Sequence, residues 1–187
     1  KREFWKKVYY FKQLMHKGME EFYITVLDND PNAIQAFHRK RAHLVRPTKR
    51  LKRCLRHLEK KAISINIISD APNESEIFEF LDFYHLKGFF NDVITPTGRF
   101  KDGKAIDLSY KGCQKIDGRI YEKLAADLHN AGILAAEALI VGDRPVDDIK
   151  RAKEKGLTTV QFTGVIDRGP SEADYVISDL AQLEGIV

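Results

Sequence analysis

Two periodicities alternate along the chain, and together they predict strands separated by helices. Short uninterrupted apolar runs are typical of strands covered on both faces, whereas apolar residues spaced three or four apart are typical of amphipathic helices. The predicted strands span residues 22–27, 63–68, 92–95, 138–141, 158–162 and 175–177, and residues 99–106 form a hairpin that turns at Asp102-Gly103. The predicted helices span residues 1–21, 31–45, 73–86, 118–132, 146–155 and 178–186, and a basic helix begins after Thr48.

Residues at the predicted helix ends support these boundaries. Asn73 and Glu76 have the spacing of a capping box, and Pro31 suits a first helical turn. Gly132 and Gly156 follow the last periodic residues of two helices, where glycine commonly ends a helix.

The order of these elements predicts an α/β fold with a doubly wound parallel sheet and helices on both faces. Strands alternate with helices throughout residues 47–187, which we interpret as the α/β core. Residues 1–46 form a helical N-terminal segment that resembles a small cap and includes the candidate first strand 22–27.

Length and composition indicate how many domains the chain has and where in the cell we expect it. The chain has 187 residues, 43% of them hydrophobic, which suits one domain or one domain with a small appendage. Cys54 and Cys113 show neither CxxC spacing nor a disulfide framework, and no apolar run approaches the length of a membrane span. We therefore expect a cytoplasmic protein without a membrane partner. The chain begins at Lys1 and not at Met, so we also consider that it is a fragment.

Basic residues gather between His38 and Lys61, where eleven lysines and arginines accompany a single acid, Glu59. Such a block can face a polyanion such as nucleic acid, or it can be the solvated face of a helix. We favour the solvated face, so nucleic acid is a less favoured partner.

Acidic and hydroxyl side chains follow three of the predicted strands. They are Asp28 and Asp30 after residues 22–27, Ser69 and Asp70 after residues 63–68, and Asp143, Asp147 and Asp148 after residues 138–141. In a parallel sheet the carboxyl ends of the strands share one edge, which is where ligands bind. Neighbouring carboxylates repel unless a cation lies between them, and Mg²⁺ prefers oxygen ligands together with substrate phosphate. These residues therefore predict a magnesium site for a phosphorylated substrate, although Asp147 and Asp148 also suit a helix N-terminus.

The chain resembles the haloacid dehalogenase (HAD) superfamily of phosphohydrolases over residues 47–187. INIISDA supplies Ser69 of the second family motif, and KIDGRIY supplies Lys115 of the third, without the usual prolines. GDRPVDDIKRAKEKG supplies Asp143 and Asp148 of the fourth, with Asp147 adjacent. VLDNDPN offers Asp28 and Asp30 for the first motif, D-x-D-x-[TV], but Asn32 stands in its last position.

The resemblance implies a role for each matched residue in phosphate monoester hydrolysis through an aspartyl phosphate. Asp28 is the nucleophile, Asp30 the acid and base, and Lys115 the cation that neutralises charge. The phosphate is bound by Ser69, Asp70, Ala71 and Lys115, and Mg²⁺ by Asp143, Asp148, Asp147 and Asp28. Lys101 and Lys104 are rivals for the role of Lys115.

Several alternatives stay open at this stage. If residues 1–46 are a cap, the nucleophile precedes Lys1. The main alternative function is a catalytically silent HAD-like domain whose basic helix, within residues 38–61, contacts nucleic acid or an assembly partner. A phosphatase of polynucleotide ends, a receiver-like domain and a dehalogenase are further alternatives. The acids after residues 138–141 argue against the last two. Substrate identity and oligomeric state are not predicted.

Overall fold

The computed structural model describes residues 28–34, 36, 47 and 49–187, and the chain divides into two compact units, Lys1–Arg46 and Pro47–Val187. The predicted helix 1–21 and strand 22–27 lie outside the described residues, as do Thr48 and residues 37–45 of the second helix.

In the N-terminal unit, a helical turn begins at Pro31, which confirms the predicted position of that proline. The carboxylate of Asp30 accepts hydrogen bonds from the backbone N–H groups of Asn32 (3.0 Å) and Ala33 (3.2 Å). Asp30 therefore caps this turn, because its side chain satisfies donors that have no partner within the helix.

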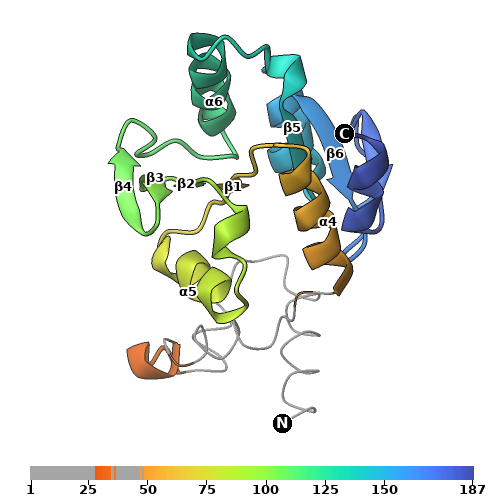
Figure 1. The fold of residues 1–187 in the computed structure, drawn as a ribbon. Coiled ribbons are helices and arrows are strands. Elements are labelled where there is room, and N and C mark those ends of the chain that lie inside the picture. The colour runs from red at the N-terminus through yellow and green to blue at the C-terminus, as the bar shows by residue number, and fades with distance from the viewer. Residues whose placement is uncertain (1–27, 35, 37–46, 48) are drawn as a thin grey trace. The chain divides into compact units, whose positions relative to one another are not determined.

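The described part of the C-terminal unit contains two sheets (Figure 1). The first has the order β1-β2-β3-β4, in which β1 and β2 are parallel and the other pairs are antiparallel. The second has the order β5-β6-β7 and is entirely parallel. The strands are β1 (Ile67–Ile68), β2 (Val93–Thr95), β3 (Gly98–Lys101), β4 (Lys104–Asp107), β5 (Leu139–Gly142), β6 (Thr158–Phe162) and β7 (Tyr175–Ile177). The predicted hairpin turn at Asp102-Gly103 is confirmed.

Helices cover the two sheets and join them. They are α4 (Lys49–Lys60), α5 (Ser75–Phe83), α6 (Arg119–Asn130) and α7 (Arg151–Lys153), with a π-helical segment (Pro145–Lys150) before α7 and short 3₁₀ helices at Lys87–Phe89, Ala135–Glu137 and Leu180–Gly185. In α4, Cys54 packs with Val160 of β6, whereas Leu55 packs with Val93 of β2. One helix therefore contacts both sheets. No described helix is long and apolar enough to cross a membrane.

The edges of β1 and β5 are open within the described residues. Each strand ends its own sheet, yet Ile68 of β1 and Ile140 of β5 pack against the same apolar cluster. Residues of β2 and the middle of β6 are buried, whereas Val141 of β5 is 38% exposed. Edge strands usually carry charged residues or proline, but β1 and β5 carry neither. Their apolar composition is typical of interior strands.

Two local predictions were wrong. The strand expected at 63–68 is reduced to Ile67–Ile68, because the Asn66 side chain accepts the N–H of Asp92 (3.2 Å) where a strand backbone would have paired. The capping box does not form, since Asn73 accepts both the N–H and the hydroxyl of Ser75 (3.0 and 2.8 Å), the first residue of α5.

Asp174 allows a test of the hydrogen bonds that fix the start of β6. Its carboxylate accepts a hydrogen bond from Lys153 (2.6 Å) and two from the Thr159 N–H and hydroxyl (2.8 and 2.7 Å). The Lys153 bond, followed by those from Thr159, lowers the pKa of Asp174 from 3.8 to about 2. Because the folded-state pKa is depressed, this stabilisation is present above pH ~4 and is lost as the pH falls towards ~2.

We expect Asp174→Asn to lower the free energy of unfolding by about 1 kcal/mol at neutral pH, since its side chain is about one third exposed. Urea denaturation between pH 7 and 3 measures the difference from the parent, which should shrink below pH ~4. Glu172→Gln, at an exposed neighbouring residue, is the matched control. A difference that does not change over this pH range would contradict the assignment.

Candidate functional site

Asp148 lies at the centre of the site and is 4% exposed. It belongs to the π-helical segment, where Arg144 O accepts the N–H groups of both Asp148 and Ile149 (3.0 and 3.2 Å). A π-helical turn changes the direction of a side chain relative to an α-helix and often marks a functional site. Here the Asp148 side chain lies directly against Gly142, the last residue of β5.

Lys115 pairs with Asp148. The Lys115 Nζ donates to Asp148 Oδ1 over 2.7 Å, and the two side chains are 16% and 6% exposed. The hydroxyl of Tyr121, a fully buried residue of α6, lies 3.4 Å from the same oxygen, and the Arg144 N–H donates to Asp148 Oδ2 (3.0 Å). Burial, together with the charge of Asp148, raises the pKa of Tyr121, so this hydroxyl stays a donor.

Asp70 connects the end of β1 to the same loop. Its carboxylate accepts the backbone N–H of Lys115 (3.0 Å), and the hydroxyl of the preceding Ser69 accepts the N–H of Ala71 (3.1 Å). The structure therefore brings Asp70, Lys115 and Asp148 together from three separate parts of the sequence. The Asp70 side chain orders the loop that carries Lys115.

Two further carboxylates follow β5, and each contacts an arginine. Asp143 Oδ2 accepts from Arg168 Nε over 2.7 Å, with both side chains 39% exposed. Asp147 Oδ2 accepts from Arg144 Nη1 over 3.1 Å on the exposed surface. Asp143 is thus the most exposed of the three carboxylates that follow β5.

The donor set near β5 fits a hard cation. Three aspartates follow this strand within six residues, 143–148, and the sequence there offers neither His nor Cys, which suits Mg²⁺ and not zinc. Within the described residues, however, no three His, Cys, Asp or Glu side chains form a ready metal site. Asp148 is buried and bonded to Lys115 and Arg144, whereas Asp143 is partly exposed and pairs with an equally exposed arginine. Asp143 is therefore the carboxylate best placed to bind Mg²⁺, which commonly uses one or two protein carboxylates.

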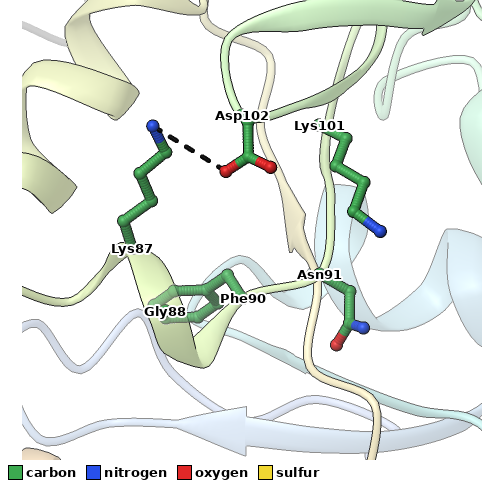
Figure 2. Close-up of a pocket in the computed structure, with 6 residues that line it drawn as sticks. All are labelled: Lys87, Gly88, Phe90, Asn91, Lys101 and Asp102. Carbon is green, nitrogen blue, oxygen red and sulfur yellow. Dashed lines mark ion pairs between the residues drawn. The ribbon is translucent and has the colours of Figure 1, made fainter.

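A separate pocket of about 460 Å³ lies between the 3₁₀ turn Lys87–Phe89 and the β3–β4 hairpin. Figure 2 shows Lys101 and Asp102 on the hairpin side and Lys87 opposite, with its Nζ 3.8 Å from Asp102 Oδ1. Lys101 therefore lines this pocket, whereas Lys115 contacts Asp148. None of the carboxylates that follow β5 lines the pocket, so we do not assign it the phosphate chemistry.

The predicted first motif lies in the N-terminal unit. Asp28 and Asp30 are exposed, and Asp28 has a φ of 50°, in the left-handed region. Asp28 belongs to the N-terminal unit and Asp143 to the C-terminal unit, so a site shared by the two stays a prediction.

The sequence did not point to Arg168. It lies in the loop after β6, whose strand pairs with β5 so that Gln161 is opposite Gly142. A signal was available, because loops that follow neighbouring parallel strands meet at the same edge of the sheet.

The basic helix α4 uses several of its cations within the molecule. Arg50 pairs with Asp179 (2.6 Å) and Arg53 with Glu184 (3.5 Å), and Lys52 donates to the carbonyl of Tyr84 (2.9 Å). These contacts give part of the basic block a structural role, and nucleic-acid binding stays a prediction.

Comparisons with known proteins point to one family. A family model described as HAD-hydrolase-like matches residues 113–183. A glyceraldehyde 3-phosphate phosphatase of Methanocaldococcus jannaschii is 30% identical over 157 residues, which are 82% of this chain and 62% of that protein. A protein of the same name from Pyrococcus furiosus is 29% identical over 153 residues, 79% of this chain and 57% of that protein. The chain thus spans less than two thirds of these relatives.

A solved structure supports the same fold. The crystal structure of a HAD phosphatase from Thermococcus onnurineus aligns with a TM-score of 0.62 at 22% identity, covering 89% of this chain and 69% of that chain. At this identity the likeness concerns the fold alone, and it confirms the predicted α/β class.

Gly142 tests the packing of the site. A Cβ at this position would lie 2.3 Å from Asp148 Cβ and 2.6 Å from its Oδ2, so Asp148 would have to move. We expect Gly142→Ala to lower the free energy of unfolding by about 1–3 kcal/mol, because overpacking displaces a buried side chain. Gly185→Ala is the matched control, since a Cβ there meets nothing within 4 Å. Urea denaturation measures both, and equal effects of the two substitutions would contradict the contact.

Proposed function

We propose that the chain is part of a Mg²⁺-dependent phosphatase of the haloacid dehalogenase superfamily that hydrolyses a small phosphate monoester, on the basis of its likeness to a HAD-hydrolase-like family model and to two phosphatases. The observation that carries this proposal is the Lys115–Asp148 ion pair beside Gly142, with Asp70 bonded to the Lys115 backbone. Phosphoryl transfer depends mainly on positioned charges, and this arrangement fixes a cation among acids at the ends of β1 and β5.

Lys115 is proposed to neutralise charge on the phosphoryl group. Its ammonium is largely buried and held by a carboxylate, so it is ordered before substrate binds. The Ser69 hydroxyl and the backbone N–H groups after β1 are the proposed donors to the phosphoryl oxygens. The Ser69 hydroxyl accepts the N–H of Ala71, so its own hydrogen stays free to donate to a phosphoryl oxygen.

Asp143 is the proposed magnesium ligand, with Asp147 as the second carboxylate of the loop. Bound Mg²⁺ would offset the negative charge of the phosphoryl oxygens and of the attacking carboxylate. Asp148 is proposed to act through Lys115, because its two oxygens accept bonds from Lys115, Tyr121 and Arg144. In this assignment, Asp143 of the fourth motif is a metal ligand, and Asp148 of the same motif positions Lys115.

Within this chain, Asp28 is the proposed nucleophile and Asp30 the acid and base, on the strength of their D-x-D spacing. A carboxylate oxygen of Asp28 would attack phosphorus as the ester P–O bond breaks, and Asp30 would give a proton to the leaving oxygen. Asp30 would then take a proton from water, which attacks phosphorus and releases orthophosphate from Asp28. Asp30 must release its bonds to Asn32 and Ala33 to do this.

The proposed substrate class is a small phosphorylated metabolite. Two relatives at 30% and 29% identity are named glyceraldehyde 3-phosphate phosphatase, so a three-carbon phosphate ester is the first substrate to assay. The alternative, a catalytically silent domain that binds a polyanion through its basic helix, has less support, because Arg50, Lys52 and Arg53 already contact groups within the molecule.

We expect Asp143→Asn to reduce Mg²⁺-dependent hydrolysis of glyceraldehyde 3-phosphate by at least about 100-fold, because the amide is a much weaker ligand than the carboxylate. The fold should remain, since Asp143 is partly exposed and bonded only to a surface arginine among the contacts found. Phosphate release measures the activity, and circular dichroism checks the fold.

Asp82→Asn is the matched control, because Asp82 is exposed, paired with Lys87 at 3.8 Å and outside the site. Parent-like turnover of Asp143→Asn would contradict the proposed metal ligand. An inactive parent chain that is retained on nucleic acid in a salt-dependent way would instead favour the silent binding domain.

A further inference from the structure

The Arg168–Asp143 pair places a protein cation on the carboxylate that the proposed function gives to Mg²⁺. The guanidinium Nε lies 2.7 Å from Asp143 Oδ2. Two positive charges cannot share this carboxylate closely without repulsion, so the arginine and a metal ion compete for it.

The loop that carries Arg168 is fixed beside the end of β5 by a buried side chain. Gln161 of β6 is 2% exposed and lies opposite Gly142 in the strand register. Its amide Nε2 donates to the carbonyl of Gly169 (2.6 Å), and its Oε1 accepts from the Ser171 hydroxyl (2.7 Å). Both polar groups of this glutamine are therefore used to hold the residues that follow Arg168.

A second turn contact sets the backbone next to Arg168. The Gly169 N–H donates to Asp167 Oδ1 (2.9 Å), and Gly169 has a φ of +87°, which side-chain-bearing residues rarely adopt. The position of Arg168 thus follows from contacts on both of its neighbours. A long flexible side chain on an ordered backbone can exchange partners while it stays at the same edge of the sheet.

The pair itself is easily exchanged. Both side chains are 39% exposed, and ion pairs with this exposure contribute little to stability. A divalent cation with oxygen ligands can therefore replace the guanidinium, whereas the buried Lys115–Asp148 pair would resist such replacement.

We propose that Arg168 leaves Asp143 when that carboxylate binds a divalent metal ion, and that its guanidinium then binds the phosphoryl group of the substrate. The planar fork of N–H donors in arginine matches phosphate oxygens. Before metal binding, Arg168 would thus balance the negative charge of the Asp143 carboxylate. After metal binding, it would add a contact to the phosphoryl group. This inference rests on the proposed function, because it takes Asp143 as the metal ligand.

The test compares the parent chain with Arg168→Gln, Arg168→Lys and Arg50→Gln by isothermal titration calorimetry. Arg50→Gln is the matched control, because Arg50 also pairs with an aspartate, Asp179, but lies on α4 and outside the site. With MgCl₂ as titrant, we expect Arg168→Gln to bind Mg²⁺ about two- to tenfold more tightly, because the competing charge is gone. In saturating Mg²⁺, we expect it to bind orthophosphate about tenfold more weakly. Arg168→Lys should stay close to the parent in Mg²⁺ affinity.

Each other outcome has a definite meaning. Equal Mg²⁺ affinity of the parent and Arg168→Gln would overturn the competition, while the proposed function would stand if both bind Mg²⁺. Tighter Mg²⁺ binding with unchanged phosphate affinity would overturn the transfer of the guanidinium to the anion. Absence of Mg²⁺ binding in every variant would overturn both this inference and the proposed metal site.

Discussion

The buried ion pair between Lys115 and Asp148 is the interaction on which the rest of the site depends. A buried carboxylate is costly unless its oxygens have donors, and those of Asp148 are supplied by Lys115, Arg144 and Tyr121. These donors come from the loop before α6, the segment after β5 and α6 itself. Asp148 can approach them only because Gly142 has no side chain. The pair therefore fixes three segments at one edge of the fold.

The carboxylates of the site therefore have different roles. Asp148 is enclosed and holds Lys115 in place, whereas Asp143 is open to solvent and contacts Arg168 through an exchangeable bond. Asp70 takes a third role, since its carboxylate orders the Lys115 loop from the end of β1. Ile68 of β1 and Ile140 of β5, the strands at the open edges, pack against the same apolar cluster, to which α6 contributes Ile120 and Tyr121.

The periodicity of the sequence predicted the elements well where burial decides the structure. The strands at 158–162 and 175–177, the hairpin at Asp102-Gly103 and the helix ended by Gly132 appear as expected. Local polar contacts account for the failures. The Asn66 side chain accepts the Asp92 N–H, which a strand backbone would have paired, and the Asn73 side chain accepts from Ser75, the residue before the Glu76 that a capping box would use. Such side-chain bonds depend on neighbours that a periodic pattern does not specify.

The sequence selected several residues of the candidate site but could not give the environment of each. Spacing and family resemblance selected Lys115, Asp143 and Asp148, and two of these are in contact. Sequence could not show that Asp148 is enclosed while Asp143 is partly exposed, because Asp148 lies in the π-helical segment, whose geometry sets the direction of its side chain. Arg168 was missed because its position follows from the buried Gln161 and not from any motif. The roles of Asp28 and Asp30 stay predictions.

A double-mutant cycle on Lys115 and Asp148 tests the central claim most directly. The free energy of unfolding is measured by urea denaturation for the parent, Lys115→Met, Asp148→Asn and the double variant. If the buried pair organises the site, each single substitution destabilises the fold, and the two are coupled by at least about 1.5 kcal/mol. Effects that add to within about 0.5 kcal/mol would show that the two residues act independently, and would contradict the account.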